Sequence, residues 1–295
     1  MEDNKGILYN MGGWSQFFFF CFLSFSGMIM FALVAGLFMN TEQMLSSAPT
    51  LRLAQTLQTI FMFLFPSIIF AFFYYGKPKI YLKANNNPNP SFLIFAILLI
   101  LIIQPLISCL GYYNQQIIVS YLPESFDWII KYEESAEKSF NLLFSDRSVN
   151  GLIFNLLVIA VVAGLAEELF FRGCLQQIMQ QIVKNKHAAI WITAIIFSAI
   201  HFQFFGFVPR ILQGALLGYI FIWSGSIWAP VIVHTVNNAF NVILLYLLYG
   251  TPELEQLNNF SFTQYIWYVI PSLVLSCLLL FIIYRKRIIS PEIEN

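Results

Sequence analysis

Long apolar runs dominate this chain and restrict the folds that it can adopt. About 20 consecutive apolar residues are enough for a helix to cross the hydrocarbon core of a bilayer. Apolar residues make up 59% of the 295 residues and charged residues only 10%, whereas a soluble domain has about 25% charged residues. Such a chain cannot cover itself with polar surface, so lipid must solvate most of its exterior. We therefore predict an integral, multi-pass, all-α membrane protein.

Eight segments have the composition of transmembrane helices, which predicts a bundle of about eight spans. The sequence contains no internal repeat and no sign of a second domain, so residues 1–295 are expected to form one membrane domain. The expected spans are Gln16–Met39, Thr56–Tyr75, Phe92–Gly111, Leu152–Arg172, His187–His201, Val208–Trp223, Ile227–Tyr249 and Tyr265–Tyr284.

One long connection, from Asn114 to Asn150, differs from the other loops. It combines charged residues with aromatic ones such as Phe126, Trp128 and Phe140. This mixture is typical of amphipathic helices that lie in the membrane interface. We expect one or two such helices here.

The distribution of Lys and Arg predicts the orientation. With the N-terminus in the cytoplasm, the inner loops carry nine of these residues and the outer loops five. Cytoplasmic loops are enriched in Lys and Arg, so we predict a cell-membrane protein with both termini cytoplasmic. The five residues assigned to the outer side are Arg52, Lys131, Lys138, Arg147 and Arg210.

Charged residues inside the spans are costly and therefore informative. The interiors of the first, second, third and eighth spans contain no Asp, Glu, Lys, Arg or His. A charge at the bilayer centre normally faces the bundle interior or water, and it marks function by default. The set inside the spans is Glu167, Glu168, Arg172, His201 and His234, with Asn237, Asn238 and Asn241 beside the last.

Helical spacing divides this set into pairs and single residues. Glu168 and Arg172 are four residues apart, on one face of a helix, and we interpret them as a structural ion pair. Glu167 is offset by about 100° around the helix and has no evident local partner, so we expect it to be functional. His201 and His234 taken singly could be hydrogen-bonded core residues, and the asparagines could serve only to hold helices together.

Three short motifs follow one another in this region. Residues 167–172 have the form EExxxR, residues 197–201 the form FxxxH, and residues 234–238 the form HxxxN. Each motif alone is weak, but the ordered set on three nearby membrane helices is specific. Over roughly Leu152–Asn241 the chain resembles the CAAX prenyl endopeptidase and bacteriocin-processing (CPBP, or Abi) family of intramembrane proteases.

The resemblance implies an all-helical membrane core around a catalytic cavity. Glu167 would be the general base, and His201 would help to hold the attacking water. His234 and Asn238 would stabilise the oxyanion, while the ion pair described above would support the site. A carboxylate in a low-dielectric cavity has its pKa raised towards the range that suits a base.

The requirement for a metal stays open at this point. Members of the family have been described both as metalloproteases and as metal-independent glutamate proteases. A catalytic zinc has three protein ligands, which Glu167, His201 and His234 could supply. The HExxH motif is absent, and one glutamate cannot easily be both ligand and base. We therefore favour a metal-independent mechanism with no certain cofactor, and keep Zn²⁺ as the alternative.

The predicted function is hydrolysis of a peptide bond in a membrane-associated or lipidated peptide or protein. Eukaryotic members of the family remove the last three residues of prenylated CaaX proteins, and bacterial relatives are linked to peptide maturation, bacteriocin self-immunity and regulation. The alternative is a non-enzymatic membrane scaffold or bacteriocin immunity factor of the same fold. A transporter would show inverted repeats, and none is present. Zero net charge argues against a nucleic-acid partner.

The depth of the motif residues adds a constraint on the fourth span. Counted from Leu152, Glu167 lies ~22 Å along the helix at 1.5 Å per residue, near the inner face. His201 lies ~20 Å from His187, near the outer face. The two can meet only if the fourth helix is longer and tilted, so we predict that it continues to about Val183.

Overall fold

The computed structural model describes residues 5–38 and 46–287, and it contains no strand in these ranges. Six of its helices are long and apolar enough to cross a membrane, or seven if the bent pair Pro90–Ile102 and Gln104–Tyr121 is one span. The predicted all-α, multi-pass class is confirmed, while the expected number of about eight spans is not. That the whole chain forms a single domain stays a prediction.

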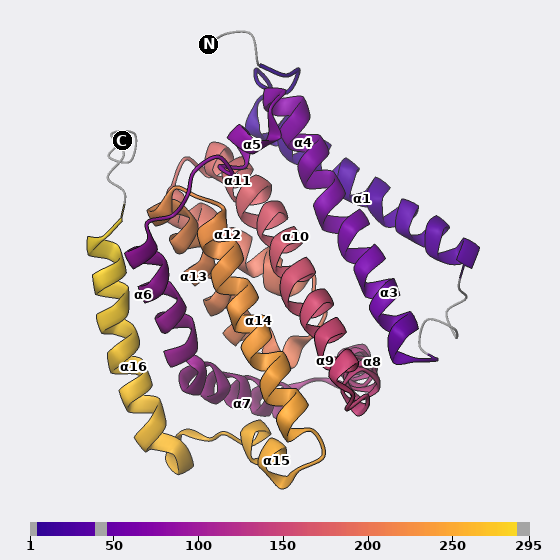
Figure 1. Ribbon diagram of the computed structural model, residues 1–295, viewed down its shortest axis with the longest axis vertical. Coiled ribbons are helices and arrows are strands. Elements are labelled where there is room, and N and C mark those ends of the chain that lie inside the picture. The colour runs from indigo at the N-terminus through magenta and orange to yellow at the C-terminus, as the bar shows by residue number, and fades with distance from the viewer. Residues whose placement is uncertain (1–4, 39–45, 288–295) are drawn as a thin grey trace.

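The helices pack side by side in an order that differs from the chain order, with α6 next to α16 (Figure 1). Their bounds are α1 (Gly13–Phe38), α3 (Ala48–Thr59), α4 (Phe65–Tyr75), α5 (Pro78–Tyr81), α6 (Pro90–Ile102), α7 (Gln104–Tyr121), α8 (Asp127–Ser145), α9 (Val149–Asn155), α10 (Ala163–Phe170), α11 (Gln176–Val183), α12 (Lys186–Ala199), α13 (Phe207–Ser224), α14 (Trp228–Leu248), α15 (Pro252–Asn258) and α16 (Phe262–Arg285). Three π-helical segments, η1 (Ile60–Leu64), η3 (Leu156–Val162) and η4 (Phe171–Leu175), join α-helices without a break.

Two expected spans differ from the prediction. The fifth is α12, whose 14 residues extend ~21 Å, less than the ~30 Å of a hydrocarbon core. The third is broken at Ile103 into α6 and α7, which bend by 41°. The last residue of the first expected span, Met39, lies outside the described residues.

The fourth span has the predicted extension. Residues Val149–Val183 form one apolar helix of 35 residues, in which Glu167 lies close to the middle. The π-helical segments η3 and η4 lie on either side of α10, which carries Glu167 and Glu168. Single π-helical turns of this kind occur frequently at functional sites.

A tight turn sets the next helix alongside this long one. Lys184 adopts a left-handed conformation with φ 54°, which ends α11. The side chain of Asn185 then accepts a hydrogen bond from the Ala188 amide and so caps the start of α12. Because only two residues separate the helices, α12 returns antiparallel to α11 and brings its last turn towards Glu167.

The charged connection between α7 and α9 forms an amphipathic helix, as predicted. α8 buries Ile129, Leu143 and Phe144, while most of its charged side chains are exposed. Directly after α8, Asp146 forms an ion pair with Arg52 of α3 at 3.1 Å. Arg52 also donates a hydrogen bond to Asn155 of α9 at 2.8 Å. Hydrogen bonds from Ser148, and then from Arg52, lower the pKa of Asp146.

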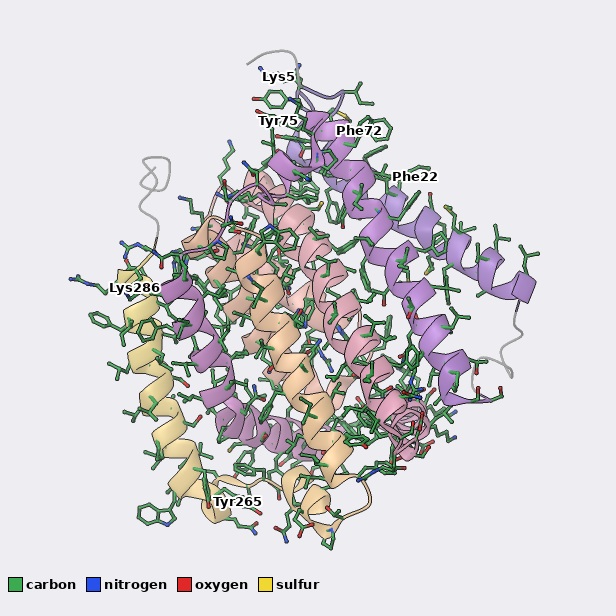
Figure 2. The ribbon with its side chains drawn as sticks, viewed as in Figure 1. Lys5, Phe22, Phe72, Tyr75, Tyr265 and Lys286 are labelled. Atoms are coloured by element: carbon green, nitrogen blue, oxygen red, sulfur yellow. The ribbon has the colours of Figure 1, made fainter. Side chains whose placement is uncertain are left out.

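The side chains on the outside of the bundle suit a lipid environment (Figure 2). Phe22 of α1 and Phe72 of α4 are exposed and point away from the protein. Lys5 and Lys286 lie towards one end of the bundle and Tyr265 towards the other (Figure 2). This placement fits termini on one side of the membrane; that this side is cytoplasmic stays a prediction.

Glycine allows α10 and α14 to approach closely. A Cβ atom on Gly164 would lie 2.8 Å from Oγ1 of Thr235 and 3.2 Å from its main-chain nitrogen. Both distances are shorter than van der Waals contact, and a short β-branched side chain has little freedom to move away. The two helices that carry Glu167 and His234 are therefore packed so closely that no side chain larger than that of glycine fits at position 164 without a shift.

We expect Gly164→Ala to destabilise the protein by about 1–3 kcal/mol, the usual cost of overpacking. The measurement is thermal unfolding of the purified protein in detergent. Gly36→Ala is the matched control, because a Cβ atom at Gly36 of α1 would meet nothing within 4 Å. Equal melting temperatures for the two variants would show that α10 and α14 are not in close contact.

Candidate active site

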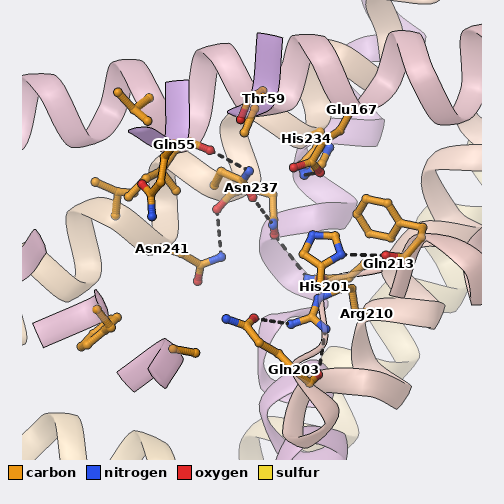
Figure 3. Close-up of a pocket in the computed structure, with 18 of the residues that line it drawn as sticks. Gln55, Thr59, Glu167, His201, Gln203, Arg210, Gln213, His234, Asn237 and Asn241 are labelled. Atoms are coloured by element: carbon orange, nitrogen blue, oxygen red, sulfur yellow. Dashed lines mark hydrogen bonds and ion pairs between the residues drawn. The ribbon is translucent and has the colours of Figure 1, made fainter. Parts of the chain in front are cut away.

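The motif residues converge on one cavity of about 630 Å³ (Figure 3). Its lining comes from α3, α6, α8, α10, α12, α13 and α14, together with η1, η3 and the loop between α12 and α13. Four residues predicted to be catalytic line it, namely Glu167, His201, His234 and Asn238. The ion-pair residues Glu168 and Arg172 do not line this cavity and are completely buried behind its wall.

The ion pair forms as the i, i+4 spacing predicts. Nη1 of Arg172 donates to Oε1 of Glu168 at 2.7 Å. Nη2 of the same guanidinium donates to the carbonyl oxygen of Gly214 at 2.8 Å. Arg172 therefore connects the long helix to α13 as well as neutralising Glu168.

Glu168 has a second partner that the spacing did not predict. Its Oε1 also lies 2.7 Å from Nδ1 of His234, on α14. A carboxylate held by an arginine is ionised and can only accept, so Nδ1 of His234 carries the proton of this hydrogen bond. Nε2 then faces Glu167, whose Oε2 lies 3.9 Å away. Glu168 thus orients the imidazole, as a carboxylate orients a metal-bound or catalytic histidine.

His201 lies in the turn after α12 and is oriented by the main chain of that helix. Its Nδ1 lies 2.7 Å from the carbonyl oxygen of Phe197, which can only accept, so Nδ1 is again the protonated nitrogen. The Phe197 ring contacts both imidazoles, with centroids 4.9 Å from His201 and 6.1 Å from His234. The two histidines therefore direct their Nδ1 atoms to the protein and leave Nε2 for other interactions.

A chain of side-chain amides fixes Asn238. Nε2 of Gln104 donates to Oδ1 of Asn237 at 2.9 Å, and Nδ2 of Asn237 donates to Oδ1 of Asn238 at 3.2 Å. Nδ2 of Asn238 in turn donates to the carbonyl oxygen of Ile159 at 3.0 Å. Because an amide nitrogen has two protons, Asn238 keeps one N–H for a ligand. Gln104 is the first residue of α7, so the bend after Ile103 brings it to this chain.

Several polar lining residues were absent from the sequence-based site. Gln55, Gln58 and Thr59 of α3 line the cavity, as does Gln213 of α13. Uncharged polar residues within apolar spans are the signal that could have found them, because they too avoid lipid.

Arg210 is placed differently from the expectation. The orientation count assigns it to an outer loop, whereas it belongs to the first turn of α13 and lines the cavity. Its guanidinium donates to Gln203, which lines the same cavity (Figure 3). The connection between α12 and α13 is short, so Arg210 at the start of α13 faces the cavity.

The side chains present do not form a metal site. Within residues 5–38 and 46–287, no group of three His, Cys, Asp or Glu side chains is arranged to hold a metal ion. Glu167, His201 and His234 share a cavity, but the described geometry does not bring them together as ligands. We therefore derive no catalytic step that uses a metal.

Comparison with known proteins finds a family model that matches the part of the chain carrying this site. Residues 149–240 match the family described as type II CAAX prenyl endopeptidase Rce1-like. The predicted resemblance is thereby confirmed, over nearly the range expected. The Rce1-like region extends from the start of α9 into α14 and carries all three motifs.

Two curated relatives match the chain, and both are uncharacterized. Protein YpbD of Bacillus subtilis (strain 168) is 33% identical over 101 residues, which are 33% of this chain and 47% of the relative. A 24.3 kDa protein of Escherichia coli is 32% identical over 107 residues, which are 34% of this chain and 48% of the relative. The chain thus spans about half the length of each. No solved structure matches the chain.

Proposed function

We propose that this protein is an intramembrane endopeptidase in which Glu167 activates water. The observation that carries the proposal is the position of the Glu167 carboxylate, 3.9 Å from Nε2 of His234, in a cavity that also contains His201. The side chain of Glu167 is only 14% exposed and has no arginine or lysine partner among the described residues. A nearly buried carboxylate inside a membrane bundle, with no Arg or Lys to balance its charge, is costly unless it has a function.

The reaction requires one base and a set of donors. Glu167 takes a proton from water as the water oxygen attacks the peptide carbonyl carbon. The resulting tetrahedral oxyanion accepts hydrogen bonds from Asn238 and His234. Glu167 then gives the proton to the departing nitrogen, and the C–N bond breaks. His201, on the same cavity wall, holds the attacking water.

The hydrogen bonds of His234 impose a condition on its role. Because Nδ1 already donates to Glu168, His234 can donate to an oxyanion only if Nε2 carries a proton as well. The carboxylates of Glu168 and Glu167 lie near Nδ1 and Nε2 of the ring, respectively, so both ring nitrogens face hydrogen-bond acceptors. Asn238 needs no such change, since its free N–H is a donor at every pH.

The substrate class that we propose is a membrane-associated or lipidated peptide or protein. Comparative membrane proteomics of wild-type and Glu167→Gln cells tests the function directly. We expect at least one peptide bond that is cut in wild-type cells to stay intact in the variant. Glu253→Gln, which changes an exposed glutamate of α15, is the matched control and should behave as wild type. Identical cleavage in Glu167→Gln and wild-type cells would refute the proposal.

The alternative is a membrane scaffold or immunity factor that keeps the fold without the chemistry. The buried cluster of Glu168, Arg172 and His234 favours it, because these residues hydrogen-bond to one another and can hold helices together without any reaction. Complementation of a deletion strain decides between the two. A scaffold predicts full complementation by Glu167→Gln, and a protease predicts none.

Gln104 gives a prediction for the amide chain. We expect Gln104→Leu to lower kcat about fivefold to tenfold, because one neutral hydrogen bond contributes about 1 kcal/mol. The effect should be much smaller in an Asn238→Ala background, since Gln104 acts on the site through Asn237 and Asn238. The measurement is a double-mutant cycle on kcat with a cleaved peptide. Fully additive effects would show that Gln104 is not coupled to Asn238.

A further inference from the structure

Arg210 is a cation of the cavity wall that the proposed hydrolysis does not use. It is half-buried and lines the same cavity as Glu167 and His201. Its Nη1 donates to the main-chain oxygen of Gln203 at 3.0 Å, and its Nη2 donates to Oε1 of the same residue at 2.9 Å. Both acceptors are neutral, so neither compensates the positive charge.

No carboxylate among the described residues lies within ion-pair distance of Arg210. Glu133 and Glu167 attract it only from farther away, and Oε1 of Glu133 accepts a hydrogen bond from the Phe205 amide at 2.9 Å. An uncompensated charge inside a membrane bundle marks a binding site or a transport path by default. A guanidinium has five N–H donors, so Arg210 keeps donors for a ligand.

The position of Arg210 relates it to the catalytic residues. In Figure 3 the imidazole of His201 lies between the guanidinium of Arg210 and the carboxylate of Glu167. All three side chains belong to one continuous cavity. A group bound at Arg210 would therefore lie on the same path as a peptide bond presented to Glu167.

We propose that Arg210 binds a carboxylate of the substrate and so determines which peptides are cut. The planar fork of a guanidinium matches the two oxygens of a carboxylate, and this pairing is stronger and more directional than one with lysine. A substrate held by its carboxylate at Arg210 can place only certain peptide bonds next to Glu167. Cleavage is thereby limited to bonds at one distance along the chain from that carboxylate. This inference rests on the proposed function and specifies its substrate.

The carboxylate can come from a peptide C-terminus or from an Asp or Glu side chain. The chemistry at Arg210 is the same for both, and the peptides used in the test separate them. One set has a free C-terminal acid and no acidic side chain. The second has a C-terminal amide and one acidic side chain, and the third has neither group.

The test measures binding rather than cleavage. Random octapeptides of the three sets are mixed in equal amounts with full-length Glu167→Gln protein in detergent, and the bound peptides are identified by mass spectrometry. We expect one of the two carboxylate-bearing sets to be enriched about tenfold to hundredfold over the neutral set, the usual effect of a hydrogen bond to a charged group. The enrichment should disappear when Arg210→Gln is added. Arg147→Gln, which changes an exposed arginine that does not line the cavity, should leave it unchanged.

Three results would overturn the inference: no enrichment of either carboxylate-bearing set, enrichment that persists in Arg210→Gln, and equal loss of all peptides in that variant. The melting temperature of each variant is measured alongside. If Arg210→Gln does not fold, Arg210→Lys decides, because it keeps the charge but not the fork and should show reduced, not abolished, enrichment. If binding depends on Arg210 but the wild-type protein cuts no peptide, only the proposed hydrolysis is refuted. If the wild-type protein cuts peptides without a preference for a carboxylate, only the role of Arg210 is refuted.

Discussion

Replacing Glu167 by glutamine is expected to reduce peptide cleavage about 10²–10⁴-fold, the range that a general base contributes. An amide cannot accept the proton of the attacking water, so the first step loses its base. The melting temperature should stay unchanged or rise, because a carboxylate that is 14% exposed and has no Arg or Lys partner in residues 5–38 and 46–287 becomes neutral. The two measurements are a cleavage assay and a thermal melt, both on protein purified in detergent.

Glu253→Gln serves as the control for this variant, since it removes a carboxylate that is exposed and distant from the cavity. Neither its activity nor its melting temperature should change. A Glu167→Gln protein that retains full activity would contradict the role of Glu167. A Glu167→Gln protein that is inactive only because it unfolds would indicate a structural role instead.

Replacing Arg172 by alanine is expected to destabilise the protein by roughly 3–5 kcal/mol, the cost of leaving a buried charge without its partner. Glu168 would lose the hydrogen bond at 2.7 Å, and the connection to the Gly214 carbonyl would be lost as well. Activity should also fall, because Glu168 orients His234. Thermal unfolding in detergent measures the first effect and the cleavage assay the second.

Arg147→Ala is the matched control, because Arg147 is exposed and donates to the Tyr249 carbonyl at the end of α14. Exposed interactions of this kind contribute about 0–1 kcal/mol, so its melting temperature should stay close to that of wild type. Suppose instead that Arg172→Ala is as stable and active as wild type while Glu167→Gln melts far below it. The roles of the two neighbouring glutamates would then be the reverse of those assigned above.

Local geometry explains which features could be predicted from the sequence. The pairing of Glu168 with Arg172 depends only on the period of one helix, and the structure confirms it. The continuation of the fourth helix to Val183 followed from the rise per residue, which is equally local. The convergence of Glu167, His201 and His234 came from motifs in sequential order, because single residues on separate helices have no common period.

Contacts between residues on different helices were not predicted from the sequence. His234 is 66 residues from Glu168, and their hydrogen bond depends on how α14 crosses the long helix. Gln104 reaches Asn237 only because α6 and α7 bend by 41° after Ile103. Hydropathy counts apolar residues and does not register a bend, so the third span was expected to be continuous.

By itself the sequence determined the membrane class, the helical composition and the local pair Glu168–Arg172, since the length of apolar runs and the helical repeat depend only on residues close in the chain. Only the tertiary structure decided that Glu168 orients His234, that Arg210 faces the cavity and that Gln104 reaches Asn237. These features depend on the rotation and depth of each helix relative to its neighbours. Packing of small residues such as Gly164 against Thr235 sets that rotation and depth, and the period of a single helix carries no information about it.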